Sequence, residues 1–193
     1  QQGTLDGVVA GEDGLELEPE LSMGKALEFD GVDDFVSISD KAILRPTRFT
    51  VEAWVRPDAV DGSDHYVLWK FTGGAQYAAS YGIRLDKNNK WIGRVTIGNT
   101  QIEVTGTSTP QSGTWYHVAL TFDGSTLRLY VNGMLEASAA AAGSPDYGAY
   151  HVYIGRRERQ AGAFESYFNG AIDEVRIWNV ARTQQQIQDN MNK

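Results

Sequence analysis

Residues 115–133 have the sequence WYHVALTFDGSTLRLYVNG, in which two runs of alternating side chains flank the tripeptide Asp123-Gly124-Ser125. Glycine tolerates positive φ angles, so Asp-Gly between two such runs predicts a tight turn. Asn132-Gly133 predicts a second turn directly after the second run. The stretch therefore predicts a β-hairpin, and with it an antiparallel sheet.

The same period-two pattern recurs along the chain. In FTVEAWV, residues 49–55, the apolar side chains at alternate positions share one face, while Thr50, Glu52 and Trp54 share the other. Further short runs bounded by turn residues occupy positions 26–29, 35–38, 65–70, 80–85, 91–97, 102–106, 151–154 and 171–178. Strands at this spacing without intervening helices predict an all-β sandwich of two antiparallel sheets.

Three other segments complete the predicted organisation. Residues 183–190 favour a short helical turn after the last strand, and residues 138–148 are predicted to form a loop of small side chains. Residues 1–23 are acidic and rich in glycine, which predicts an edge strand or a lead-in segment. We expect residues 1–193 to form a single domain, since sandwiches of about 200 residues commonly do.

Composition narrows the possible partners. The net charge of −8 and the pI near 4.8 disfavour nucleic acid and anionic membranes, and they are compatible with calcium or with neutral sugars. The chain has no cysteine and no apolar run of about 18 residues, so we expect neither disulfides nor membrane insertion. Because it shows no signal peptide and begins with Gln1, we expect a mature or excised piece of a longer protein. Nothing in the sequence suggests an obligate oligomer, so we expect a monomer.

Four segments in order carry a family resemblance. They are GKALEFDGVDD at 24–34, FTVEAWV at 49–55, WYHVA at 115–119 leading into LYVNG at 129–133, and FNGAIDEVRIW at 168–178. Together they resemble the laminin G-like domains of the concanavalin A-like lectin/glucanase superfamily over residues 24–190. The resemblance implies a two-sheet antiparallel jelly-roll sandwich with a short C-terminal helical turn.

The resemblance implies function only broadly, because this architecture hosts lectins, adhesion modules, glycosidases and lyases. From the resemblance we expect a non-catalytic carbohydrate-binding or adhesion module of a larger secreted or cell-surface protein, with a polysaccharide or glycan as its partner. The alternative is a protein-interaction or spacer domain without sugar affinity, whose partner would be a surface protein. A glycoside hydrolase or polysaccharide lyase is a third, less favoured hypothesis.

A structural calcium site is the first candidate. Asp30, Asp33 and Asp34 crowd one turn, and such a cluster either binds a hard cation or remains a solvated acidic turn. The resemblance implies that Asp173 supplies a carboxylate beside Asp30 or Asp33, so the expected calcium ligands are Asp30, Asp33 and Asp173. The acidic loop at 58–65 is a weaker candidate, since turns rich in Asp, Gly and Ser are common without a metal.

Catalysis has weaker support in the sequence. Glycoside hydrolysis generally needs two suitably placed carboxyl groups, and the nearest acidic string, at 28–33, breaks at a turn. Glu52 stands alone on its strand, where a buried, hydrogen-bonded glutamate is the simpler prediction. His65, His117 and His151 are too dispersed to predict a zinc site, and we expect His117 to be packed and hydrogen-bonded. We therefore expect a protein that is not an enzyme.

Sugar recognition combines an apolar wall with a few oriented polar groups. Aromatic and arginine side chains gather in two stretches, and we expect the ligand to be bound by Trp69, Tyr77, Tyr81, Arg84 and Trp91 from the first and by Tyr147, Tyr150 and Arg156 from the second. Tryptophan in a β-sandwich usually lies in the core, and we expect this of Trp54, Trp115 and Trp178.

Overall fold

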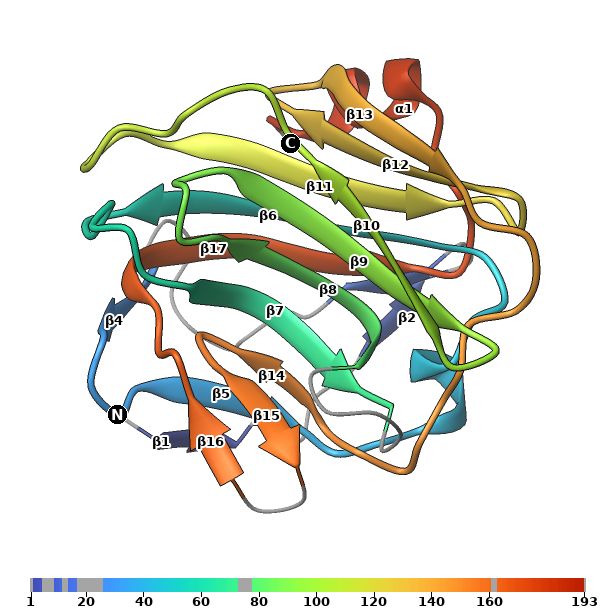
Figure 1. The fold of residues 1–193 in the computed structure, drawn as a ribbon, viewed down its shortest axis with the longest axis horizontal. Coiled ribbons are helices and arrows are strands. Elements are labelled where there is room, and N and C mark those ends of the chain that lie inside the picture. Colours follow the sequence, from blue (N-terminus) through green and yellow to red (C-terminus); the bar gives the residue numbers. More distant parts are fainter. Residues whose placement is uncertain are drawn as a thin grey trace.

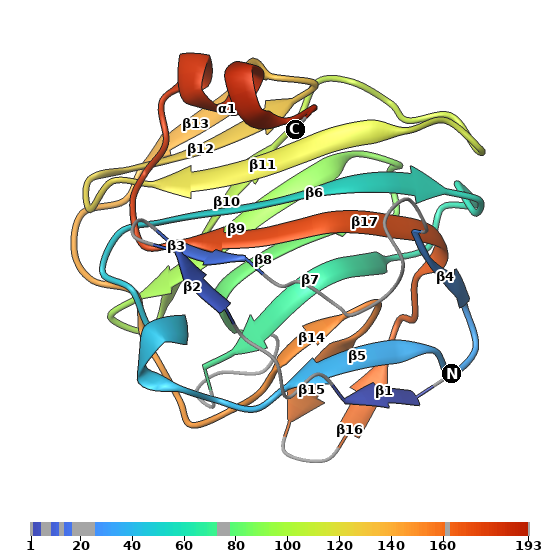
Figure 2. The same ribbon diagram turned by 180° about the vertical axis from the view of Figure 1, so that it is seen from behind.

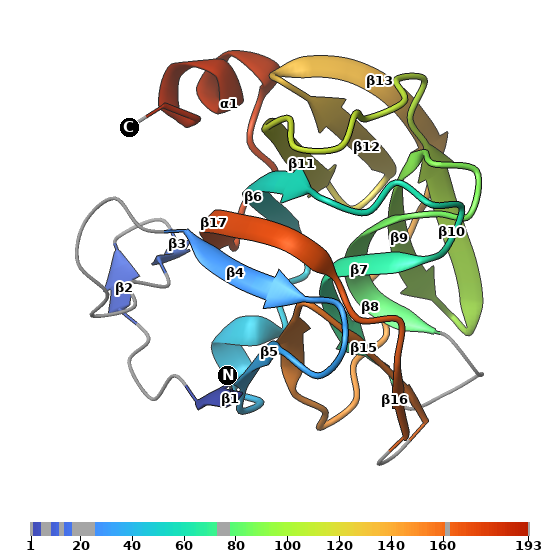
Figure 3. The same cartoon turned by 90° about the vertical axis from the view of Figure 1, so that its left-hand side faces the viewer.

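The computed structural model describes residues 2–4, 9–11, 14–16, 26–72, 78–160 and 163–192. They form a sandwich of two sheets, which face each other in the side view of Figure 3. This confirms the predicted fold class. Figure 1 looks onto the seven-stranded sheet and Figure 2 onto the eight-stranded sheet.

The seven-stranded sheet has, in order, the strands β1 (Gln2–Thr4), β5 (Phe35–Ile38), β14 (Val152–Ile154), β7 (His65–Phe71), β8 (Ala79–Leu85), β9 (Trp91–Ile97) and β10 (Thr100–Thr105). The eight-stranded sheet has β13 (Met134–Ala140), β12 (Thr126–Val131), β11 (Tyr116–Phe122), β6 (Phe49–Pro57), β17 (Asn169–Trp178), β3 (Gly14–Glu16) and β2 (Val9–Gly11), with β4 (Leu27–Asp30) paired to β17. A separate hairpin consists of β15 (Arg157–Gln160) and β16 (Ala163–Glu165), and β15 lies against β7. The helical elements are the 3₁₀ turn η1 (Ala42–Leu44) and the helix α1 (Gln184–Asn190).

The core lies between the two sheets, and the alternation along β6 shows how the sequence builds it. Phe49, Val51, Ala53 and Val55 all belong to the main core cluster, as their period-two spacing predicts. Leu127, Leu129 and Val131 repeat this arrangement on β12. Alternate side chains of these strands consequently project from the outer faces of the sandwich, where a binding site can be built.

Two elements depart from the sequence prediction. Residues 138–148 were expected to form a loop, but β13 extends to Ala140 and pairs with β12. The hairpin that joins these strands turns at Asn132 and Gly133, whose φ angles of 49° and 73° suit the turn that the Asn-Gly pair predicts. The β15–β16 hairpin was not predicted.

The helix α1 covers part of the outer face of the eight-stranded sheet (Figure 2). Its Ile187 packs on Ala119 and Tyr130, and the indole N–H of Trp54 donates to the Met191 carbonyl at its end. Thr183 caps its first turn in a reciprocal capping box with Gln186. Within the described part of the chain, no helix has the length and apolar character needed to cross a membrane.

The described stretches before residue 17 pair with later strands. Strand β1 runs parallel to β5, while β2 and β3 form a hairpin that continues the eight-stranded sheet beside β17. Strand β17 thus has β6 on one side and both β3 and β4 on the other.

Candidate functional site

The outer face of the seven-stranded sheet has an aromatic floor. Tyr66, Trp69 and Phe71 of β7 form a cluster apart from the main core, and the Tyr66 and Trp69 rings meet edge to face with centroids 4.7 Å apart. The neighbouring strand has Gly82 opposite Trp69, where an added Cβ would lie 2.2 Å from the indole. The missing side chain of Gly82 therefore lets the Trp69 ring lie over β8.

Arginine side chains lie over this floor. The Arg94 guanidinium is 5.4 Å from the centroid of a Trp69 ring, and that of Arg84 is 6.0 Å from the Tyr66 ring. Arg157, from the β15–β16 hairpin, lies 4.6 Å from the Tyr66 centroid and donates to its hydroxyl. We call these five residues, together with Glu103, the arginine–aromatic face.

Each of these arginines forms an ion pair with a carboxylate. Glu103 of β10 accepts hydrogen bonds from both Arg84 and Arg94, Asp64 accepts one from Arg84 at 2.7 Å, and Glu165 pairs with Arg157. Three guanidiniums thus face three carboxylates, so the arginines of the face and their carboxylate partners together carry no net charge although the chain carries −8. Burial alone would lower the pKa of Arg84, but Tyr66, Asp64 and Glu103 outweigh it and raise that pKa. The face is a set of fixed, charged hydrogen-bond donors.

Several polar atoms of this face are buried and lack a hydrogen-bond partner among the described residues: Trp69 Nε1, Ser80 Oγ, Arg84 Nε and Thr96 Oγ1. Ser80 precedes Tyr81 on β8, and Thr96 follows Val95 on β9. Tyr81 and Val95 are paired and point into the core, so the hydroxyls of Ser80 and Thr96 project toward the outer face. A buried polar atom without a partner costs about 1–3 kcal/mol. Such atoms are rare in folded proteins, so their grouping marks a polar patch beneath this face.

The structure separates the residues predicted to bind sugar. Trp69 and Arg84 come together on the arginine–aromatic face, although the Trp69 side chain is wholly buried. Tyr81 and Trp91 do not fit the prediction, because they point into the core between the sheets and are fully buried. Tyr81 donates its hydroxyl to the Leu44 carbonyl there.

The second group of residues predicted to bind sugar also packs against other parts of the chain. Tyr147 packs on the core and donates its hydroxyl to the Pro46 carbonyl, and Arg156 is buried over the rings of Phe35 and Tyr153. Tyr150 packs against Phe71 at the margin of the aromatic floor. Tyr77 lies outside the described residues.

The sequence prediction missed Tyr66, Ser80, Arg94, Thr96 and Glu103. A signal for three of them was present, since polar and apolar side chains alternate along 92–97 and 101–105. Arg94 pairs with Gly82 on β8 and with Glu103 on β10, so Gly82, Arg94 and Glu103 lie in one row across the sheet. Alternation could therefore have placed Arg94 and Glu103 on one face, but only the observed strand order makes them neighbours.

Three tryptophans expected in the core lie on the opposite face of the molecule. Trp54, Trp115 and Trp178 project from the outer side of the eight-stranded sheet, and Trp115 is 37% exposed. They occupy the positions that alternate with core residues such as Val55 and Ile177. Strand alternation, rather than the usual preference of tryptophan for the interior, decides their placement.

Glu52 and His117 share a buried polar site beneath α1. Glu52 accepts hydrogen bonds from Trp178 Nε1 at 2.9 Å and from Arg182 at 3.0 Å, which confirms the prediction of a buried, hydrogen-bonded glutamate. His117 is packed as predicted, but neither ring nitrogen has a partner among the described residues, and its Nε2 is 3.9 Å from Glu52 Oε2. Burial, with Arg176 and Arg182 nearby, lowers the pKa of His117 to about 4, so its imidazole is neutral at pH 7.

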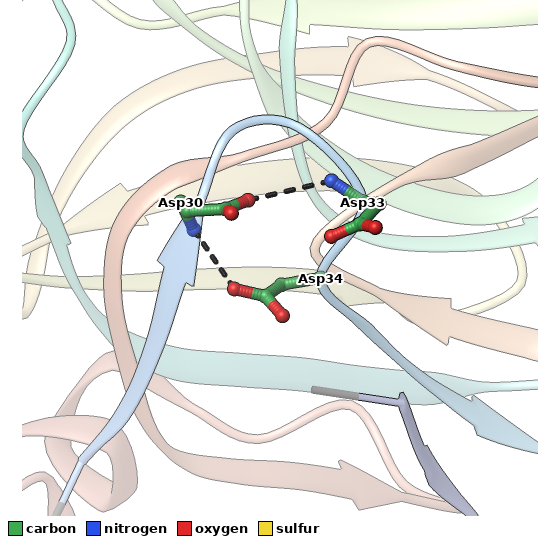
Figure 4. A group of neighbouring side chains, drawn as sticks. All are labelled: Asp30, Asp33 and Asp34. Atoms are coloured by element: carbon green, nitrogen blue, oxygen red, sulfur yellow. Dashed lines mark hydrogen bonds between the residues drawn. The ribbon is translucent and has the colours of Figure 1, made fainter.

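The acidic turn after β4 brings Asp30, Asp33 and Asp34 together (Figure 4). One carboxylate oxygen from each lies within 4.8 Å of the others. Asp30 Oδ1 accepts from the backbone N–H groups of Val32 and Asp33, and Asp34 Oδ2 accepts from that of Asp30. The group offers the hard oxygen ligands that calcium prefers.

The structure does not bring Asp173 to this turn. Strand β17 places Asn169 opposite Asp30, and Asp173 lies four positions further along, opposite Trp54 on β6. Four positions of a strand span roughly 13 Å. The residue that faces the turn is Asn169, whose side chain packs against Gly31.

The acidic loop at 58–65 is engaged in ion pairs. Each of its aspartates contacts a basic side chain, in the pairs Asp58–Arg56, Asp61–His65 and Asp64–Arg84. Among the described residues, the turn at 30–34 is the one place where three potential metal ligands converge.

Comparisons with known proteins agree with this architecture. The chain is 32% identical over 79 residues to mouse (Mus musculus) pappalysin-1; the match covers 41% of the chain and 5% of that protein. The structure resembles that of a Bacteroides ovatus protein proposed to bind carbohydrate, with a TM-score of 0.65, 23% identity, and 86% of this chain and 47% of that one covered. The IT-sialidase CBM40 of Ruminococcus gnavus, bound to alpha2,3 sialyllactose, gives a TM-score of 0.66 at 14% identity, with 86% and 96% covered.

These structural likenesses show a shared fold. The family itself is shown by a laminin G-type family model, described as the concanavalin A-like lectin/glucanases superfamily, which matches residues 30–188. The chain therefore belongs to the concanavalin A-like lectin/glucanases superfamily, as a laminin G-like domain.

Proposed function

We propose that this domain is a non-catalytic carbohydrate-binding module and that it binds glycan on the arginine–aromatic face. The observation that carries the proposal is the grouping of fixed guanidiniums, aromatic rings and buried polar atoms without partners on one face. The sialyllactose bound by the Ruminococcus module and the carbohydrate binding proposed for the Bacteroides protein, which both share the fold, support it.

The chemistry of the face suits recognition of hydroxyl groups. Sugar hydroxyls accept hydrogen bonds from guanidinium N–H groups. With the hydroxyl groups of serine and threonine they can act either as donor or as acceptor. Arg84 and Arg94 lie over aromatic rings and are bound by carboxylates, so their donors are oriented before a ligand arrives. Such preorganisation reduces the entropy lost on binding.

The acidic residues considered for catalysis have structural partners. Glu52 bonds to Trp178 and Arg182 beneath α1, and Glu28 forms an ion pair with Arg56 at the surface. Neither lies on the arginine–aromatic face. This supports a binding role for the domain.

We further propose that the module belongs to a larger secreted or cell-surface protein and that a structural calcium ion stabilises it. Asp30, Asp33 and Asp34 would hold the ion, and its charge would offset the repulsion of the three carboxylates. The ion would then brace the connection between β4 and β5.

A protein-interaction role is the second candidate. Met134 and Leu135, two successive residues of β13 at the end of the eight-stranded sheet, are 58% and 47% exposed. Exposed apolar side chains on an edge strand are a common feature of protein contacts. Capture of a specific protein partner by a domain that binds no glycan would favour this role.

Affinity electrophoresis through gels containing a panel of neutral and acidic polysaccharides tests the proposed function. We expect at least one polysaccharide to retard the domain and Arg94→Ala to weaken that binding about tenfold or more, as loss of a charged hydrogen bond does. Arg128→Ala, which removes an arginine paired with Asp123 on the other sheet, is the matched control and should bind as the unmodified chain does. Retardation by no polysaccharide would contradict the proposal.

A further inference from the structure

We propose that the glycan carries a carboxylate and that Glu103 occupies the place of this carboxylate in the unliganded domain. The inference rests on the proposed function and names the class of its ligand, a carboxylated sugar. It starts from an unusual convergence, since one oxygen atom of Glu103 accepts three hydrogen bonds from two arginines.

The geometry around Glu103 Oε1 is that of a bound anion. Arg94 donates to it from Nε at 2.9 Å and from Nη2 at 2.6 Å, and Arg84 donates from Nη2 at 3.1 Å. Guanidinium groups present their N–H donors in a planar fork that matches a carboxylate. The two arginines therefore form a cradle for one carboxylate group.

The cradle has supports that do not involve Glu103. Arg94 lies over Trp69, while Arg84 lies over Tyr66 and also bonds to Asp64 at 2.7 Å. The side chains of both arginines are 11% exposed. They would keep their positions if Glu103 moved away.

Glu103 itself is held less firmly. It belongs to β10, the strand at the end of the seven-stranded sheet, and its side chain is 36% exposed. A glutamate at a sheet edge can rotate into water, where its charge is solvated. Of the three side chains in this contact, Glu103 is thus the one that a ligand can displace.

The surroundings of the cradle favour a sugar acid over a simple anion. Thr96 lies two positions from Arg94 along β9, roughly 7 Å away on the same face, and Ser80 lies beside it on β8. Neither hydroxyl has a hydrogen-bond partner among the described residues. Both hydroxyls lie beneath the surface, so a sugar whose carboxylate entered the cradle would bond to this pair only after the groups that cover it move aside.

Competition between Glu103 and a ligand carboxylate for the two arginines has a measurable consequence. A ligand carboxylate must displace Glu103, which is attached to the same chain and so is present at high effective concentration. The unmodified domain should accordingly bind carboxylated sugars weakly. Removal of the Glu103 charge should strengthen that binding.

The test compares Glu103→Gln with the unmodified domain by isothermal titration calorimetry. The acidic probes are oligogalacturonate, for a uronic acid, and alpha2,3-sialyllactose, for a sialic acid; methyl-esterified oligogalacturonate and lactose are their neutral counterparts. We expect about tenfold or greater tightening for at least one acidic probe and no change for its neutral counterpart. The probe that responds identifies the type of acid.

Three further variants serve as controls. Glu28→Gln removes one negative charge from an ion pair on the other sheet, so it should leave affinity for the acidic probes unchanged. Arg94→Ala added to Glu103→Gln should abolish the gain. Glu103→Asp, whose shorter side chain reaches the arginines less well, should show a smaller gain and serves if Glu103→Gln fails to fold.

Four results would overturn the inference. An equal gain for Glu28→Gln would show a general effect of charge, and equal tightening toward polyglutamate would show recognition of carboxylates without a sugar. If the unmodified domain binds a neutral polysaccharide and Glu103→Gln gains nothing for either acid, the proposed function stands and this inference fails. If no variant binds any probe or polysaccharide, both fail.

Discussion

The surroundings of His117 make the stability of the domain depend on pH. Its imidazole is buried beside Glu52, and the positive charges of Arg176 and Arg182 oppose its protonation. The pKa of His117 is about 4 in the folded chain, against an ordinary value of 6.5. As the pH falls below 6.5 the unfolded chain takes up this proton first, so stability falls until the pH reaches about 4.

We therefore expect the free energy of unfolding to decrease by about 3 kcal/mol from this group alone between pH 7 and pH 4. His117→Leu should lose most of that dependence between pH 7 and 4.5, measured by urea unfolding at a series of pH values. His151→Leu replaces an exposed histidine and should keep the dependence. Equal pH profiles for the unmodified chain and His117→Leu would refute this assignment.

Individual residues also show how much of the candidate sugar site could be predicted from the sequence. Arg84 and Trp69 are predictable from composition, because arginine and aromatic side chains near turns are common in sugar sites. Tyr81 and Trp91 satisfy the same criterion, but they point into the core. Every residue of β7 is buried, so the burial preferences of its side chains do not distinguish its two faces.

At the scale of elements, α1 depends on its contacts with the eight-stranded sheet. The helix has seven residues, too few to be stable alone in water. Its carbonyl groups accept from Trp54, Arg176 and Arg182, and Thr183 caps its first turn. These bonds hold the end of the described chain on the sheet.

Thr183→Ala should lower the free energy of unfolding by about 1 kcal/mol, since it removes the side-chain acceptor of the capping box. Hydrogen exchange should also quicken at the amides of Ile187 and Met191, which bond within this segment. Gln185→Ala changes an exposed position of the same helix and should alter stability little. Unchanged stability and exchange in Thr183→Ala would show that the capping box contributes nothing to holding the helix.

Most strands could be predicted from the sequence because their alternation is strong. The predicted run 35–38 matches β5, and the run 126–131 matches β12. Strand β13 was missed because its small side chains, in MLEASAA, show little contrast between its two faces. Its position was nevertheless implied by Asn132-Gly133, since an Asn-Gly turn predicts a strand on both of its sides.

At the scale of the whole molecule, the proposed calcium ion at the acidic turn of residues 30–34 should affect the free energy of unfolding. The proposed calcium ion would bind only the folded chain, where Asp30, Asp33 and Asp34 come together. It should therefore raise the free energy of unfolding by about 2.7 kcal/mol at one hundred times its dissociation constant. Thermal melts with excess calcium and with a chelator would measure this shift.

The two variants Asp33→Asn and Asp173→Asn distinguish the observed arrangement from the one that the family resemblance implies. Asp33→Asn should lose the calcium-dependent shift, whereas Asp173→Asn should keep it, because Asp173 lies four positions along β17 from the residue that faces the turn. Loss of the shift in Asp173→Asn would make Asp173 a ligand after all. No shift in the unmodified domain would remove the calcium proposal.

The position of β17 has a consequence for biosynthesis. This strand is the last in the sequence, yet it lies inside the eight-stranded sheet, with β6 on one side and β3 and β4 on the other. A nascent chain that has emerged only to residue 168 lacks the strand that joins these partners. Because its pairing closes loops of more than a hundred residues, the sandwich should fold slowly and only after this strand has been synthesised.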